Sequence, residues 1–176
     1  YSSLLIDHED YETFYVGEGN DFWRSEDGGN SWESLHSFGS EVFHFDNSRA
    51  NSDYMYLLAR NGIYRSTDRG ESFTAVSLPP GLSANNASYG RIAAGGTNPL
   101  DVWLMDYRAG ATSSRNRVWY SSNGGNSWTS WHTSALAGRQ WTAMAHHVGS
   151  NGGVYIASNR GGNAGTMPAK IMYRDK

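Results

Sequence analysis

An eight-residue pattern occurs three times in this 176-residue chain, at residues 25–32, 66–73 and 121–128. Its consensus is Ser-x-Asp/Asn-x-Gly-x-Ser-aromatic, and the third copy carries Asn in place of Asp. An Asp or Asn side chain can accept hydrogen bonds from backbone N–H groups just ahead of it, and this closes a tight turn. Glycine at the fifth position permits a positive φ angle without steric cost. We therefore predict three structural turns between strands, formed by Ser25, Asp27, Gly29, Trp32, Ser66, Asp68, Gly70, Phe73, Ser121, Asn123, Gly125 and Trp128.

Short apolar stretches surround these turns and repeat about every 40–50 residues, a period typical of propeller blades. The first strand of each unit is expected at 4–7, 42–46, 90–93 and 141–144, and the second at 13–16, 54–58, 101–105 and 153–157. The third is expected at 22–23, 63–64, 118–120 and 171–173, and a fourth strand follows each turn, as at 32–35 and 73–76. No helical periodicity interrupts the pattern, so the chain is predicted to be all-β.

The repeated turn resembles the Asp box, or BNR repeat, of sialidases, xyloglucanase-like glycoside hydrolases, sortilin-type receptors and photosystem assembly factors. The resemblance implies a β-propeller whose blades have four antiparallel strands, with the box between the third and fourth. It implies blades at about 1–40, 41–88, 89–138 and 139–176, the last incomplete. Because Asp boxes occur in enzymes and non-enzymes alike, the resemblance specifies architecture and leaves function open.

A blade needs a neighbour on each of its two faces, so we expect the chain to form part of a larger propeller. The missing blades would come from the rest of a parent protein or from another chain, and a ring of four blades with a borrowed strand is the less favoured alternative. The sequence begins with Tyr rather than Met, which we interpret as a processed or excised piece.

Composition excludes several classes of function. There are 14 Lys+Arg against 17 Asp+Glu, so no excess of positive charge favours nucleic acid. No apolar run approaches the roughly 20 residues of a membrane helix. With no Cys, the chain can form neither disulfides nor thiolate metal sites.

Strand parity places the boxes at one end of the blades, and the second-to-third-strand loops and interblade links at the other. We call these the box end and the loop end. The loop-end connections lengthen in the later blades, and loops on a rigid scaffold often hold binding residues. A ligand site at the loop end, suited to glycan, is predicted from aromatic and planar polar residues: Tyr89, Arg91, Tyr107, Arg108, Trp141, Asn159 and Arg160. The alternative is that these loops are solvated insertions that bind nothing. The aromatic residues at repeat positions are expected in the core, namely Trp23, Trp32, Trp119 and Trp128.

Glycoside hydrolysis requires two carboxyl groups about 5–9.5 Å apart. Asp106 is the better single candidate on the loop side, with Glu18 behind it, but the sequence offers no obvious partner acid. Asp7 and Asp46 are predicted to follow the first strand in equivalent positions, which assigns them to the repeat. The pair 146–147 is His-His, but neighbours on a strand point to opposite faces, so we predict neither a metal site nor a cofactor.

Three functions remain open. The favoured one is a non-catalytic propeller module of an extracellular or cell-surface protein, of bacterial origin, that binds glycan or protein. The second is a fragment of a xyloglucanase-like or sialidase-like glycoside hydrolase whose other catalytic acid lies outside this chain. The third is a non-enzymatic scaffold of the assembly-factor kind.

Overall fold

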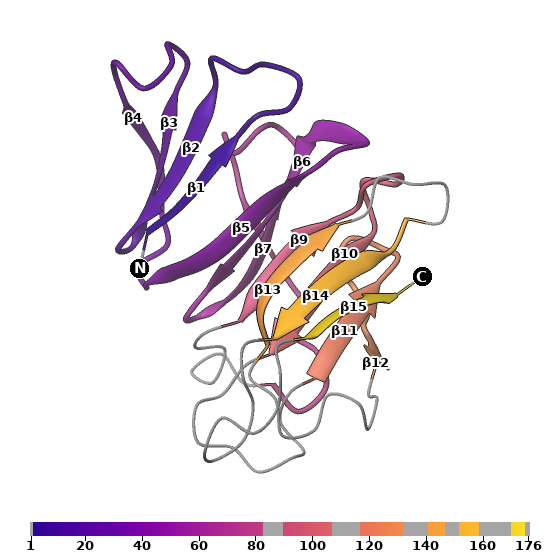
Figure 1. Cartoon of the computed structure of the whole chain (residues 1–176). Coiled ribbons are helices and arrows are strands. Elements are labelled where there is room, and N and C mark those ends of the chain that lie inside the picture. The colour runs from indigo at the N-terminus through magenta and orange to yellow at the C-terminus, as the bar shows by residue number, and fades with distance from the viewer. Residues whose placement is uncertain are drawn as a thin grey trace, which may run out of the picture.

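The computed structural model describes residues 2–82, 90–106, 117–131, 141–146, 152–158 and 170–174. All the regular secondary structure in these residues is strand, organised in four antiparallel sheets. Figure 1 shows the sheets following one another along the chain, from indigo β1–β4 to yellow β15. Within the described part of the chain, no helix is long and apolar enough to cross a membrane.

Each sheet is a simple meander, which we call a blade. The first contains β1 (Ser2–Ile6), β2 (Phe14–Glu18), β3 (Asp21–Ser25) and β4 (Glu33–Ser37). The second contains β5 (Val42–Ser48), β6 (Asn51–Ala59), β7 (Gly62–Ser66) and β8 (Thr74–Val76). The third contains β9 (Arg91–Ala94), β10 (Val102–Asp106), β11 (Arg117–Ser121) and β12 (Thr129–Trp131). The fourth, as far as it is described, contains β13 (Trp141–His146), β14 (Val154–Ser158) and β15 (Lys170–Arg174).

The first strands of successive blades lie against one another: β1 contacts β5, β5 contacts β9, and β9 contacts β13. This arrangement places the first strands innermost and the box turns at the outer strands, as in a propeller. The predicted all-β fold of four-stranded blades is therefore confirmed. Each predicted strand overlaps a strand of the structure, with ends that differ by a few residues.

The hydrophobic core is divided into three clusters, one for each contact between blades. Strand side chains alternate between two faces, so each blade supplies one face to the cluster behind it and one to the cluster ahead. Tyr15 and Phe22 of the first blade pack with Phe45 and Met55 of the second. The second and third blades meet through residues such as Tyr56, Ile63, Val102 and Trp119, and the third and fourth through Trp103, Val118, Val154 and Ile156.

Two predicted core residues lie outside the three clusters. Trp23 on β3 is only partly buried and belongs to none of them. Trp32, the aromatic residue that ends the first box, is 40% exposed, whereas Phe73 and Trp128 in the later boxes are partly buried against the clusters. The later aromatic residues lean on the blade before them: Phe73 stacks edge-on against Phe22, with ring centroids 5.3 Å apart. Among the described residues, no sheet packs behind the first blade, so no such surface covers the indole of Trp32.

Candidate functional site

The three box turns share one arrangement of hydrogen bonds, centred on the first Ser and the Asp or Asn. In the second box, the Ser66 hydroxyl donates to Asp68 Oδ1 (2.7 Å) and accepts from the Gly70 N–H (2.9 Å). Asp68 also accepts from the backbone N–H of Ser72 (2.9 Å) and from its hydroxyl (2.5 Å). In the first box, Ser25, Asp27, Gly29 and Ser31 repeat this arrangement with separations of 2.6–2.8 Å. The side chains therefore hold the turn together from within.

The third box keeps the same geometry with an amide in place of the carboxylate. Asn123 Oδ1 accepts from the Ser121 hydroxyl (2.9 Å) and from the Ser127 N–H (2.9 Å). Its Nδ2 donates to the Ser127 hydroxyl (2.8 Å), so the direction of that one hydrogen bond is reversed. The turn thus depends on the oxygen that Asp and Asn share and not on a charge.

The turns also require left-handed backbone at two successive positions. The fifth-position glycines Gly29, Gly70 and Gly125 have φ of 93°, 88° and 86°. The position before them is also left-handed, and in the second box Arg69, a residue with a Cβ, holds it at φ 56°. Its guanidinium pairs with Glu9 of the first blade (2.6 Å) and with Asp53 (3.3 Å), contacts that help to hold this residue in place.

The hydrogen bonds favour the ionised form of the box carboxylates. The hydroxyl and N–H of Ser31, followed by the Ser25 hydroxyl, lower the pKa of Asp27 to about 2. Burial raises the pKa of Asp68, but the hydrogen bonds from Ser72 and Ser66 outweigh it and the net pKa is lowered. These acids remain ionised at neutral pH and are occupied by their own turns, so they do not serve as proton donors to a substrate.

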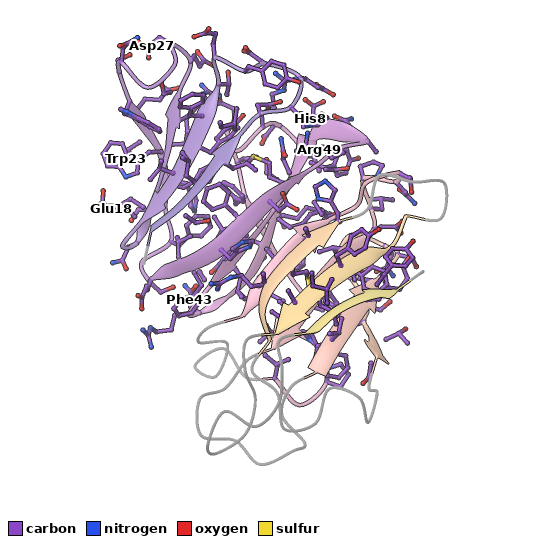
Figure 2. All side chains as sticks on the ribbon, viewed as in Figure 1. His8, Glu18, Trp23, Asp27, Phe43 and Arg49 are labelled. Carbon is purple, nitrogen blue, oxygen red and sulfur yellow. The ribbon has the colours of Figure 1, made fainter. Side chains whose placement is uncertain are left out.

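The topology places the boxes and the predicted ligand site at opposite ends. Figure 2 shows Asp27, in the first box, and Glu18, at the turn between β2 and β3, at opposite ends of the first blade. Arg91 and Trp141 begin the innermost strands β9 and β13, and Asp106 ends β10 in register with Arg117. All three positions therefore belong to the loop end.

Of the predicted ligand residues, Arg91 is the one whose side chain the structure describes. It is partly buried, and its Nη1 donates to the Gly90 carbonyl at 3.0 Å. Trp141 is described as a strand position alone. Tyr89, Tyr107, Arg108, Asn159 and Arg160 lie outside the described residues, so their assignment to a site remains a prediction.

A polar cluster along the innermost strands was not predicted from the sequence. On β5, the alternate residues His44, Asp46 and Ser48 all reach the third blade. His44 Nδ1 accepts from the Ile92 N–H (3.4 Å), Asp46 Oδ2 accepts from the Ala94 N–H (3.0 Å), and the Ser48 hydroxyl donates to the Gly95 carbonyl (2.6 Å). Asp46 Oδ2 also lies 3.0 Å from His146 Nδ1 on β13. One carboxylate therefore joins the second, third and fourth blades.

The predicted equivalence of Asp7 and Asp46 is wrong. Asp46 lies inside β5 in register with Tyr56, and the residue of β1 in register with the matching Tyr15 is Leu5. β5 continues past Asp46 to Ser48, whereas β1 stops at Ile6, one residue before Asp7. An acid at a position that is apolar in the first blade was the signal that sequence analysis overlooked, because it becomes visible only once the register is known.

The electrostatics of this cluster keep His44 neutral. Burial, followed by the positive charge of Arg91, lowers the pKa of His44 to about 4, and the charge of Asp46 opposes this in part. A neutral ring is required for Nδ1 to accept the Ile92 N–H. Asp46 accepts a hydrogen bond from His146 Nδ1 in the tautomer that carries its proton there, and in that tautomer Nε2 is an acceptor. The cluster can therefore hold blades together and present one imidazole nitrogen.

Neither a catalytic triad nor a metal site is found among the other clusters of polar side chains that the structure describes. Ser52 lies near both Asp7 (2.8 Å) and His8 (3.1 Å), but its hydroxyl donates to the carboxylate, whereas a triad requires the acid on the far side of the histidine. Ser52 and Asp7 are also fully buried. Among the residues that the structure describes, no group of three or more His, Asp or Glu is arranged to hold a metal ion.

The box end of the first blade carries a pocket of about 260 Å³, lined by Arg24, Glu26, Asp27, Ser31, Trp32 and Glu33. An exposed indole beside polar groups has the chemistry that sugars favour. However, the Arg24 guanidinium is engaged by Glu33 and by Glu71 of the second blade, both at 2.5 Å. With Asp27 committed to its turn as well, the pocket offers few polar groups to a ligand.

The blade topology and the box turns together define an Asp-box β-propeller. Residues 20–172 match the Sortilin-Vps10 family (sortilin, neurotensin receptor 3), and the chain belongs to this family. The match begins just before β3 of the first blade and ends within β15 of the fourth, so it includes all three boxes.

Individual relatives come from several kinds of protein. A xyloglucanase from Hypocrea jecorina (strain QM6a) is 32% identical over 172 residues, which cover 92% of this chain and 20% of that protein. The GH74 enzyme from Niastella koreensis has a TM-score of 0.68 at 15% identity, with 98% of this chain and 28% of that chain covered. YCF48 from Cyanidioschyzon merolae has a TM-score of 0.58 at 15% identity and covers 98% and 56%. The two structural matches show the fold alone, and the xyloglucanase relates the chain to glycoside hydrolases.

Proposed function

We propose that this chain is a polysaccharide-binding propeller module of an extracellular or cell-surface protein and that it has no catalytic activity of its own. The observation that carries the proposal is the 32% identity to a xyloglucanase over 172 residues. That enzyme acts on xyloglucan, so the ligand class we propose is a β-glucan of the xyloglucan type. The chain spans a fifth of the length of that relative, and the activity of the whole enzyme is therefore not carried over.

Binding is proposed at the loop end, near the starts of β9 and β13. Arg91 supplies a planar donor there, and the box acids at the other end are held in their own hydrogen bonds. Stacking of a sugar ring on Trp141, with hydrogen bonds from arginine and asparagine, would give weak binding with a Kd in the range of about 1 µM to 1 mM.

The proposal of binding without catalysis rests on the lack of an obvious partner acid for Asp106 in the sequence. Hydrolysis of a glycosidic bond uses two carboxyl groups on either side of the bond. Asp106, at the end of β10, is the acid we would assign, and its partner would have to come from outside this chain. The alternative proposal is accordingly a fragment of a glycoside hydrolase, favoured by the same xyloglucanase match. In that case Asp106 would act only when the remainder of the enzyme is present.

The test is calorimetric titration with xyloglucan oligosaccharides, combined with a reducing-sugar assay on polymeric xyloglucan. We expect saturable binding and no release of reducing ends. Trp141→Ala and Arg160→Ala should each weaken binding at least about tenfold, because each removes one of the few contacts that a sugar can make.

Trp32→Ala is the matched control, since it removes an exposed tryptophan at the box end. It should leave binding unchanged. Loss of binding in Trp32→Ala with retention in Trp141→Ala would place the ligand in the box-end pocket and refute the loop-end assignment. If the chain binds no glycan but binds a protein at the same loops, the proposed ligand is a protein and not a polysaccharide.

A further inference from the structure

Every contact between blades has the same direction, because the same side of one blade always meets the opposite side of the next. We call the side of a blade that faces the next blade its front face, and the side that faces the preceding blade its back face. In the first contact, Tyr15 and Phe22 on the front face of the first blade meet Phe45 and Met55 on the back face of the second. The box aromatic residue belongs to the back face, as shown by Phe73 on Phe22 and by Trp128, whose Nε1 donates to the Ser77 carbonyl of the second blade (2.7 Å).

The front face of the fourth blade is exposed at positions that are buried in the other blades. By strand register, Tyr155 occupies the position of Tyr15, Tyr56 and Trp103, which are 0–1% exposed, yet Tyr155 is 41% exposed. Ile171 occupies the position of Phe22, Ile63 and Val118, which are likewise 0–1% exposed, and it is 73% exposed. Tyr173, beside Tyr155 with ring centroids 4.8 Å apart, is 39% exposed. Tyr155 and Ile171 therefore match front-face positions that are buried in the first three blades, whereas the counterparts of Tyr173 (Arg24, Arg65 and Tyr120) are partly buried there.

The back face of the first blade is exposed in the same way. Leu4 is 64% exposed and Ile6 is 45% exposed, and both lie on the innermost strand β1. On β5 and β9 the matching residues, Phe45 and Ile92 for Leu4 and Asn47 and Ala94 for Ile6, are 0–3% exposed. With Trp32 at 40%, this face presents apolar groups at three positions that a preceding blade would cover.

We propose that the front face of the fourth blade of one copy docks on the back face of the first blade of a second copy, so that the chain associates head to tail. Each face continues the pattern of the three contacts already present, and the second copy carries the matching face. Such a contact is heterologous, and it closes into a ring if the rotation permits. Two copies of four blades would give eight, which lies within the roughly 4–8 blades of known propellers.

The test is sedimentation velocity over a concentration series, with one variant that blocks each face. Leu4→Lys blocks the back face and Ile171→Lys blocks the front face. Both positions are well exposed, so the fold should tolerate a charged side chain there. The wild type should show a mass that increases with concentration. Each variant alone should associate at least about tenfold more weakly, because a charge replaces buried apolar surface in the contact.

The decisive sample is an equimolar mixture of the two variants. The Leu4→Lys chain retains its front face and the Ile171→Lys chain retains its back face, so the mixture should form a 1:1 heterodimer that neither variant forms alone. Tyr11→Ser is the control, because Tyr11 is 75% exposed in the turn between β1 and β2, outside both faces. It should associate as the wild type does.

Three results would overturn the proposal. A wild type that stays monomeric up to about 1 mM would show that the faces do not recognise each other. Association by Ile171→Lys alone, as strong as that of the wild type, would indicate a back-to-back contact. A mixture that stays monomeric would exclude head-to-tail docking. If near-ultraviolet circular dichroism shows that a lysine variant is unfolded, Leu4→Gln and Ile171→Thr replace the pair, with the same outcomes.

Discussion

The first and second boxes contain nearly the same turn in different surroundings. Their Ser, Asp and Gly make matching hydrogen bonds, and their fifth-position glycines have φ of 93° and 88°. Behind the second box lies the first blade, and a Cβ on Gly70 would come within 2.8 Å of the Phe22 ring. No described blade lies behind the first box, and a Cβ on Gly29 would meet only ordinary contacts from 3.6 Å outward. The turn is therefore a local device, and its energetic importance comes from the blade on which it rests.

The largest effect is expected from alanine at the two glycines. Gly70→Ala should destabilise by about 2–5 kcal/mol, because left-handed strain adds to overpacking against Phe22. Gly29→Ala should cost only the strain, about 1–2 kcal/mol. Chemical denaturation at low protein concentration measures both. Equal losses would show that packing behind the second box contributes nothing.

The next largest difference in stability is expected between alanine variants of the box aromatic residues. Phe73→Ala removes a ring that packs on Phe22 and Phe38, with centroids 5.3 Å and 5.1 Å away, and should cost about 2–3 kcal/mol. Trp32→Ala removes an exposed indole and should cost less than about 1 kcal/mol. Thermal melting of the two variants, at protein concentrations too low for the chain to associate, tests this difference. A larger loss for Trp32→Ala under those conditions would mean that another part of the same chain covers the indole.

A third comparison concerns the acid itself. Asp68→Ala leaves the Ser72 N–H and the hydroxyls without their acceptor and should cost about 1–3 kcal/mol. Asp68→Asn should cost less than about 1 kcal/mol, since Asn123 already makes an equivalent turn in the third box. Urea midpoints of the two variants provide the measurement. If Asp68→Asn is as damaging as Asp68→Ala, the charge rather than the oxygen holds the turn.

The smallest effect is a dependence on pH. The folded-state pKa of Asp27 is lowered to about 2 from 3.8, so its stabilising contribution is complete above about pH 4 and is lost as the pH falls through 2. Asp27→Asn should remove this part of the acid sensitivity, and Asn123→Asp should add a similar part to the third box. Melting temperatures between pH 2 and pH 5 report both changes. Identical pH profiles for Asp27→Asn and the wild type would contradict the lowered pKa.

These contrasts also show what the sequence could predict. The box turns close through hydrogen bonds that span at most four residues, so a local pattern specified the turns, the strands around them and the all-β fold. The exposure of Trp32 depends on whether a blade lies behind it, and no residue near it encodes that. The contact between Asp46 and His146 joins positions 100 residues apart, which no local pattern can indicate. In addition, Asp46 corresponds to Leu5 and not to Asp7, and this correspondence is visible only in the strand register.

The polar cluster formed by His44, Asp46 and Ser48 on β5 also protects the chain against aggregation. The innermost strand of a blade is a sheet edge, and a row of unused backbone donors on such an edge is a template for strand addition by another chain. On β9 the N–H groups of Ile92 and Ala94 are taken by His44 and Asp46. An incoming strand would have to displace two side chains that are anchored in the neighbouring blade. The same contacts that join the blades thus make β9 a poor seed for intermolecular β-structure.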